Sequence, residues 1–351
     1  MLVTSCFRNI RTCSFVFNSY EYGRCREGTL TMAESFAPWA VLSNHGCVHL
    51  DSAPASVFLK TSPHGAYTTT RTGNEGEYLL LWTRHLRRLS QSMEVLASAM
   101  PDRFPHPPST FSGLQNLVKP SLQAGLQRAL PLRRSGEELN VTILASTDGH
   151  SDRLTWDVSV HLSNYVPRSP PIPAHIAVLG SGRDLPLAKY SLWASAREPL
   201  EKAKPPGATE IVLSNDGDGL LEGSVTNFFV VAMNPDVEVQ TAALGDGVLP
   251  GVIRQLVIEV CEEYEIPVRE VMPSWQARGT WIESFVTSSL RMVQPVESIR
   301  MCQPWVPPQL LEDPEWDEVR FDRIASVTER IRSRVLQRAL DEGLPVREYL
   351  R

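Results

Sequence analysis

The sequence predicts a mixed α+β fold divided into two domains. Its 351 residues correspond to about two domains of ordinary size. Short strand patterns and amphipathic helix patterns occur on both sides of the stretch 164–173, in which residues 167–173 hold four prolines. Such a stretch is stiff and extended, so we place the domain boundary there. The predicted parts are a presequence or alternative start at 1–34, a small α/β domain at 35–163, the linker at 164–173, a larger domain at 174–300, and an acidic loop with a C-terminal helix at 301–351.

The first domain contains a predicted hairpin, a helix and a half-buried strand. Tyr67–Thr72 and Tyr78–Trp82 are predicted strands, and Gly73–Gly76 is the turn between them. Apolar residues at alternate positions predict a further strand over Leu154–Leu162. A helix is expected from about Thr83, because one set of apolar residues recurs at helical spacing before Pro101. These residues are Leu86, Leu89, Met93, Leu96 and Met100.

The second domain is predicted to be richer in strands. Its amphipathic helix spans about Gly251–Tyr264, and a charged amphipathic helix at about Arg320–Ala339 closes the chain. The proline-rich, acidic stretch Trp305–Asp317 is expected to form a loop. The predicted strands are His175–Leu179, Glu210–Ser214, Val225–Met233 and Trp281–Thr287.

Composition excludes several classes of protein. The chain is 42% hydrophobic and 21% charged, which is typical of a globular protein and excludes a disordered or fibrous one. Its formal net charge of −6 gives no overall attraction to nucleic acid or to an anionic membrane. No apolar run approaches the roughly 18 residues of a membrane span. The six cysteines lack zinc-ligand spacing, so no metal site is predicted.

Residues 1–31 differ in composition from the rest of the chain. They carry four arginines, several serines and cysteines, and Glu21 and Glu27 as their acids. This composition suits an organelle transit peptide, which would direct the protein to a plastid or mitochondrion. The alternative is that Met32 begins the protein and that the location is cytoplasmic. An intracellular location follows from either reading.

Four short sequence features carry the functional information. Each is common in proteins when it occurs alone, but their order along this chain is informative. Lys189 follows the linker, Glu222 comes immediately before a buried strand, and Leu249–Arg254 opens the strong helix. Phe285–Ser289 ends an apolar strand in a pair of hydroxyl residues. A single lysine is usually a solvated surface group, and a Glu-Gly pair is usually a turn.

In this order the features resemble the class IV aminotransferases, the fold-type IV pyridoxal-phosphate enzymes. The likeness covers about residues 64–300 and rests mainly on Glu-Gly-x-x-x-Asn at 222–227 and Leu-Pro-Gly-x-x-Arg at 249–254. The runs at 65–71 and 85–89 look like the family's first strand and helix. The family includes branched-chain and D-amino-acid aminotransferases and 4-amino-4-deoxychorismate lyase. The resemblance implies a small α/β domain, a larger domain around a barrel-like sheet, a cofactor between them, and a homodimer.

The resemblance also implies roles for individual residues. Lys189 matches the lysine that forms a Schiff base with pyridoxal 5′-phosphate and then transfers the α-proton. Glu222 matches the acid that keeps the pyridine nitrogen protonated. The phosphate would bind at a helix N-terminus formed by Gly251, Val252 and Ile253, with Ser288 and Ser289 as further donors. Arg84 is a possible phosphate ligand, and its alternative is one charge of a solvated face shared with Arg87 and Arg88. Arg71 could bind a substrate carboxylate or simply meet solvent.

The sequence differs from the family pattern at two places, and we therefore consider three functions. Family members often carry an asparagine, and sometimes a tyrosine, after the lysine, but in Lys189–Ala194 neither stands at the usual offset. Thr68 replaces the glutamate of many aminotransferases. The leading hypothesis is an aminotransferase acting on an amino acid and a keto acid, with no nucleic-acid or membrane partner. The second is a lyase that eliminates pyruvate from aminodeoxychorismate. The third is a relative that has lost catalysis.

Overall fold

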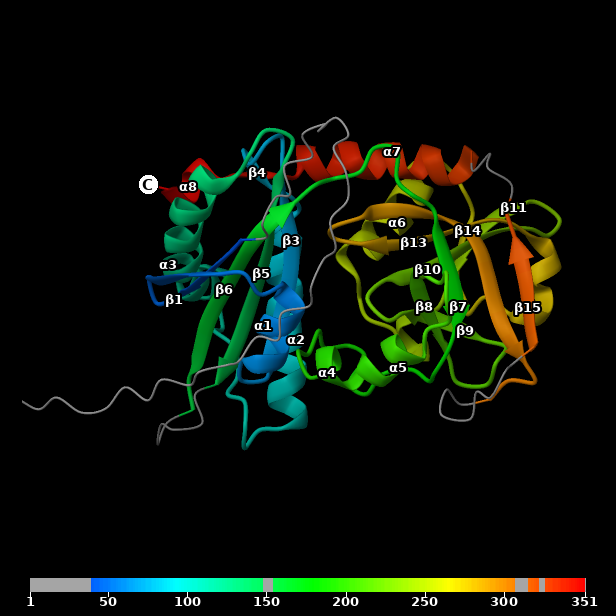
Figure 1. Cartoon of the computed structure of the whole chain (residues 1–351), viewed down its shortest axis with the longest axis horizontal. Helices are drawn as coiled ribbons and strands as arrows, with labels where there is room; N and C mark the ends of the chain where they lie inside the picture. The colour runs from blue at the N-terminus through cyan, green and yellow to red at the C-terminus, as the bar shows by residue number, and fades with distance from the viewer. Residues whose placement is uncertain (1–38, 148–153, 307–314, 322–325, 351) are drawn as a thin grey trace, which may run out of the picture. The chain divides into compact units, whose positions relative to one another are not determined.

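The computed structural model describes residues 39–147, 154–306, 315–321 and 326–350. Residues 38–351 form one compact unit that contains two β-sheets. Figure 1 shows the sheets side by side, with helices packed around each of them. The predicted presequence lies outside the described residues.

The first sheet has seven strands in the order β16-β4-β3-β5-β6-β1-β2. Neighbouring strands in it are antiparallel. All but β16 come from the first half of the chain, and β16 adds a strand from the C-terminus. The strands are β1 Ala40–Asn44, β2 Cys47–Asp51, β3 Gly65–Gly73, β4 Tyr78–Leu79, β5 Glu138–Thr147, β6 Trp156–Tyr165 and β16 Leu344–Pro345.

Two long helices cover one face of this sheet. Helix α2 (Trp82–Ala99) packs on β3, and α3 (Phe111–Ala129) packs on β6 and β1. Alternate residues of β5 and β6 point toward these helices and form the core with them. The opposite face of the sheet carries α1 (Ala55–Thr61) and turns polar side chains toward the second sheet.

The second sheet has nine strands and closes on itself. Strands β10, β13, β14, β7, β8 and β9 follow one another, and β9 pairs again with β10, so these six form a barrel. This closed sheet agrees with the barrel-like sheet that the resemblance implies. The strands are β7 Ala174–Val178, β8 Glu210–Ser214, β9 Leu220–Gly223, β10 Asn227–Met233, β11 Val237–Thr241, β12 Val268–Glu270, β13 Trp281–Ser288, β14 Met292–Gln303 and β15 Glu315–Arg320.

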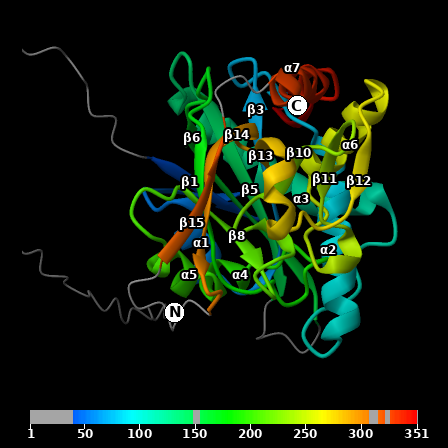
Figure 2. The same cartoon turned by 90° about the vertical axis from the view of Figure 1, so that its right-hand side faces the viewer.

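The remaining helices join the two sheets. Helix α6 (Val252–Glu263) packs on β13 and contacts α7 (Ser326–Asp341), which lies along the upper edge of the molecule in Figure 1. The chain then returns to the first sheet through β16, and α8 (Arg347–Leu350) packs on α3. Short helices α4 (Trp193–Ala196) and α5 (Glu198–Ala203) lie between β7 and β8 in the sequence, and Figure 2 shows them below β8. Within the described residues, no helix is both long and apolar enough to cross a membrane.

Some boundaries differ from those predicted. The second hairpin strand, β4, ends at Leu79 because Leu81 takes a left-handed conformation with φ 50° and α2 then begins at Trp82. The stretch predicted as an acidic loop instead starts strand β15 at Glu315, while 307–314 lie outside the described residues. Helix α7 begins six residues later than the predicted Arg320, which belongs to β15.

Helix α7 is capped by a side chain from the barrel. The buried carboxylate of Glu283 on β13 accepts the backbone N–H groups of Val327 and Thr328, at 3.0 and 2.7 Å, and also the Thr328 hydroxyl. These N–H groups have no partner within the helix, so the carboxylate satisfies them and complements the positive end of the dipole.

We predict that Glu283→Ala lowers the free energy of unfolding by about 1–3 kcal/mol, because it leaves buried donors unpaired. Urea unfolding followed by circular dichroism measures the change. Glu283→Gln keeps one acceptor oxygen and should lose clearly less stability than the alanine variant. Equal stability of the alanine variant and the wild type would contradict the capping role.

Candidate active site

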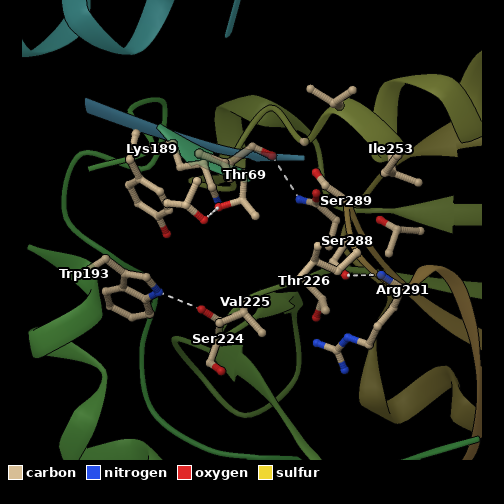
Figure 3. Close-up of a pocket in the computed structure, with 18 of the residues that line it drawn as sticks. Thr69, Lys189, Trp193, Ser224, Val225, Thr226, Ile253, Ser288, Ser289 and Arg291 are labelled. Carbon is tan, nitrogen blue, oxygen red and sulfur yellow. Dashed lines mark hydrogen bonds between the residues drawn. The ribbon is translucent and has the colours of Figure 1, made fainter. Parts of the chain in front are cut away.

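A cavity of about 420 Å³ lies between the two sheets. Its walls come from β3 and β5 of the first sheet and from the barrel side, including β9, the start of α6 and the end of β13. Figure 3 shows Lys189 and Trp193 on one side of it and Ile253, Ser288 and Ser289 on the other. The residues of the sequence-predicted site that line it are Lys189, Glu222, Gly251, Val252, Ile253, Ser288 and Ser289.

The backbone around Lys189 is held against the edge of β3. The amide of Tyr67 donates to the Lys189 carbonyl at 2.8 Å, and the amide of Ser191 donates to the Gly65 carbonyl at 2.9 Å. The Ser191 hydroxyl accepts the Gly65 amide at 3.0 Å. On the other side, the Lys189 amide donates to the Ser92 hydroxyl of α2 at 3.0 Å. The segment after the linker therefore extends the first sheet, and this fixes where the lysine enters the cavity.

The amine of Lys189 faces the phenol ring of Tyr67. Its Nζ lies 4.6 Å from the centre of that ring. Burial lowers the pKa of Lys189 to about 8, helped by the charges of Arg88 and Arg183 and opposed by Tyr67. Burial raises the pKa of Tyr67, but the nearby charges of Lys189, Arg197 and Arg183 outweigh it and bring that pKa to about 8. The amine is thus much more easily deprotonated than an ordinary lysine.

The tyrosine next to the lysine in sequence faces elsewhere. Tyr190 packs edge-on against Phe104 and His64, and it does not line the cavity. Tyr67, from β3, is the tyrosine beside the lysine. The family's missing tyrosine after the lysine is thus matched in chemical type by a residue about 120 positions earlier, which sequence spacing could not reveal.

Glu222 is a buried acid at the bottom of the cavity. Its Oε1 lies 2.7 Å from Arg183 Nε, and this contact is an ion pair that lacks hydrogen-bond alignment. Its Oε2 accepts the Leu249 amide at 3.0 Å and the Asn227 side-chain amide at 3.3 Å. Burial raises the pKa of Glu222, while Arg183 and the Leu249 amide act in the opposite direction.

Asn227 connects Glu222 to the start of α6. Its side-chain amide also donates to the Leu249 carbonyl at 2.9 Å. A Cβ atom on Gly251 would lie 2.0 Å from Asn227 Oδ1, so only glycine permits this approach. The two motifs, 222–227 and 249–254, are therefore parts of one hydrogen-bonded unit.

The N-terminus of α6 opens into the cavity. Gly251 is its N-cap residue and supplies no side chain to the free backbone N–H groups. Ser288, at the end of β13, accepts the Arg291 amide at 3.2 Å, and Ser289 follows it on the cavity wall. Unpaired N–H groups and hydroxyl groups at one helix end suit an anion such as a phosphate.

The two arginines of α2 have different surroundings. Arg84 does not line the cavity; it forms ion pairs with Glu259 at 2.7 Å and with Glu342 at 2.6 Å. Arg88 lines the cavity, is buried, and donates to the Thr68 hydroxyl at 2.8 Å. Burial lowers the pKa of Arg88 to about 10. Among the described residues no carboxylate pairs with it, so its charge is available to an anion in the cavity.

Sequence reasoning missed several cavity residues, among them Tyr67, Arg88, Arg183, Arg197 and Arg291. A signal existed for Arg88, because it lies three residues after His85 and four before Ser92, and all three are buried on the same face of α2. Arg71, by contrast, is buried outside the cavity wall, where it donates to the Thr72 carbonyl at 3.1 Å and lies over the Tyr165 ring.

We predict that Lys189 titrates with a midpoint near pH 8, far below the 10.5 of an ordinary lysine. Its neutral form therefore dominates above that pH and its charged form below it. The ¹³Cε shift of labelled lysines in the cofactor-free protein measures the midpoint, and Lys189→Arg assigns the resonance.

Tyr67→Phe removes an interaction that favours the charged amine, so the midpoint should fall further. A lysine in the wild type that titrates above pH 10, or a midpoint that rises in the variant, would contradict this account.

Comparisons with known proteins identify the fold and the family of this chain. The family model for amino-transferase class IV matches residues 65–299. A branched-chain aminotransferase from Thermoproteus uzoniensis, solved with norvaline, is 19% identical with a TM-score of 0.61, over 88% of this chain and 99% of that one. A fold IV-transaminase from Curtobacterium pusillum is 18% identical with a TM-score of 0.62, over 85% and 99%.

A hypothetical aminotransferase from Mycobacterium tuberculosis, in its PLP-bound form, is 15% identical with a TM-score of 0.61, over 86% and 99%. A sequence search of curated proteins found no match. The structural neighbours have the same fold as this chain, and the family model covers well over half of it. The chain belongs to the class IV aminotransferase family.

Proposed function

We propose that the protein is a pyridoxal-phosphate-dependent aminotransferase that exchanges an amino group between an amino acid and a keto acid, with Lys189 as its catalytic residue. The observation that carries the proposal is the half-buried amine of Lys189 in one cavity with the carboxylate of Glu222. Membership of the class IV family supports an enzyme that depends on this cofactor.

The residues of the cavity fit the cofactor. Glu222 Oε1 has no aligned hydrogen bond within the described part of the chain, so it can accept the N–H of a pyridinium ring. The uncapped start of α6 at Gly251, Val252 and Ile253, with Ser288 and Ser289, supplies donors for a phosphate. Arg88 supplies a buried positive charge for the same group in place of Arg84, whose guanidinium Glu259 and Glu342 engage.

Each residue would have a definite task. When bound, the cofactor supplies an aldehyde that links to an amine and a ring that stabilises negative charge at the substrate's α-carbon. Lys189 would hold the cofactor covalently and, once displaced by the substrate, move a proton to and from that carbon. Its low pKa favours the neutral amine that both tasks require. Glu222 would keep the ring nitrogen protonated, and a cationic ring would in turn favour the ionised carboxylate.

The lyase reaction uses the same cofactor and is the alternative. The run Tyr67-Thr68-Thr69 on β3 motivates it, because many aminotransferases carry glutamate at position 68. Thr68 faces α2, where it contacts His85 and Arg88, whereas Thr69 and Tyr67 face the cavity. The structural neighbours described above are aminotransferases, which favours the transaminase. The homodimer stays a prediction, supported by the exposed apolar side chain of Val225 on the cavity wall.

We predict that the purified protein with added cofactor has a visible absorbance band that Lys189→Ala abolishes. Amino acids should bleach the band, and a keto acid should restore it, because the amino group must be passed on. A panel of L- and D-amino acids, each with pyruvate or 2-oxoglutarate, identifies the pair.

The lyase is tested in parallel by incubating the protein with aminodeoxychorismate in the absence of any keto acid. Release of pyruvate and 4-aminobenzoate in that incubation alone would replace the transaminase by the lyase. A wild-type protein that takes up no cofactor would overturn both enzyme functions and leave a non-catalytic relative.

We predict that Arg88→Gln raises the dissociation constant of pyridoxal phosphate about tenfold or more, because a charge-assisted contact to the phosphate is lost. Arg84→Gln is the matched control from the same helix. It should keep the wild-type affinity while losing stability, since it breaks the ion pairs with Glu259 and Glu342. Fluorescence titration of the cofactor measures the affinity. If only the Arg84 variant bound pyridoxal phosphate more weakly, the phosphate contact would belong to Arg84 and not to Arg88.

A further inference from the structure

The cavity is strongly cationic, and two of its five basic side chains are paired with carboxylates. Five basic side chains line it: Arg88, Arg183, Lys189, Arg197 and Arg291. Glu222 is the one acidic side chain among the described residues that line the cavity. Arg183 pairs with Glu222, and Arg291 pairs with Glu210 on β8, each at 2.7 Å.

The other three bases differ in what they contact. Lys189 faces the Tyr67 phenol, and Arg88 donates to Thr68. The guanidinium of Arg197 makes no hydrogen bond or ion pair with any part of the chain that the structure describes. It is half-buried, and it is not a side chain that simply extends into solvent.

The position of Arg197 is set by the same segment that positions the lysine. Helix α4 begins four residues after Lys189, and Arg197 is its C-cap residue and the residue before α5. The neighbouring acids are engaged elsewhere: Glu198 pairs with Lys60 and Lys202, and Glu201 accepts Ser224 and pairs with Lys204. No carboxylate in the described part of the chain forms an ion pair with Arg197, although its charge helps to lower the pKa of the nearby Glu201.

Arg197 also acts on the end of the cavity where the lysine lies. Together with Lys189 and Arg183, its charge lowers the pKa of Tyr67 against the effect of burial. Figure 3 shows that Lys189 and Trp193 lie on the side away from Ser288, Ser289 and Ile253. The anion site at the start of α6 and the charge of Arg197 are thus two separate features of one cavity.

We propose that Arg197 recognises a carboxylate group of the substrate. This inference rests on the proposed function and adds to it a specificity-determining residue. A planar guanidinium donates two parallel N–H groups to a carboxylate, and in a half-buried site such a contact is stronger than in water. The residue would favour amino acids and keto acids over simple amines.

The test uses unreactive probes and the full-length protein with added cofactor. Pentanoate carries one carboxylate, glutarate carries two, and pentanamide is the neutral analogue of similar shape. Isothermal titration measures their dissociation constants in the wild type, Arg197→Gln and Arg197→Lys. Arg87→Gln is the matched control, because it removes an exposed charge of α2 outside the cavity wall.

We expect the wild type to bind the carboxylates more tightly than pentanamide. Arg197→Gln should weaken carboxylate binding about tenfold to a hundredfold and leave pentanamide unchanged, while Arg197→Lys keeps part of the affinity. A preference for glutarate that disappears in Arg197→Gln assigns the residue to the second carboxylate of a dicarboxylic substrate. Equal losses for both probes assign it to the carboxylate that every amino acid carries.

Unchanged carboxylate binding in Arg197→Gln, or a wild type that does not distinguish pentanoate from pentanamide, would overturn the inference. The visible absorbance band separates this result from a failure of the proposed function. Arg197→Gln should retain the band, whereas a protein that uses no cofactor lacks it in the wild type as well.

Discussion

The site depends on one backbone contact between the two halves of the chain. At the level of Tyr67, β3 is the open edge of the first sheet, since β4 reaches only Thr72 and Gly73. The segment 189–191 pairs with this edge through hydrogen bonds of 2.8 and 2.9 Å. An unpaired strand edge in the interior would leave buried N–H and C=O groups unsatisfied. The pairing removes that cost, and it also places a lysine from the second half of the chain beside a tyrosine from the first.

The barrel supplies the other half of the site through local constraints. Glu222 lies in the short strand β9, and Asn227 starts β10 directly opposite it. Asn227 and the amide of Leu249 hold the carboxylate, and Gly251 lets α6 begin within contact of Asn227. The acid, the turn and the helix start are thus connected by hydrogen bonds, which hold the acid and the proposed anion site at the start of α6 at one separation.

These two kinds of constraint explain what the sequence could predict. The start of α6, Glu222 and the hydroxyl pair at the end of β13 are encoded within short, regular segments, and the sequence predicted that they share one cavity. Helix α3 was not predicted, because Pro120 and Gly125 lie inside it. Its packing on the sheet outweighs their low propensity: a Cβ on Gly125 would come within 2.6 Å of Leu162. Arg84 and Arg88 are one helical turn apart, and the distant Glu259 and Glu342 engage Arg84 outside the cavity.

The distribution of charge adds a last constraint on the ligand. The whole chain is acidic, with a formal net charge of −6, yet five of the six charged groups on the cavity wall are basic. Walls of low dielectric constant concentrate this positive potential in the cavity and draw small anions toward it. A phosphate at the start of α6 would compensate the charge at one end of the cavity. The end near Arg197 would still be cationic, and an anionic substrate would therefore gain most of its electrostatic stabilisation there.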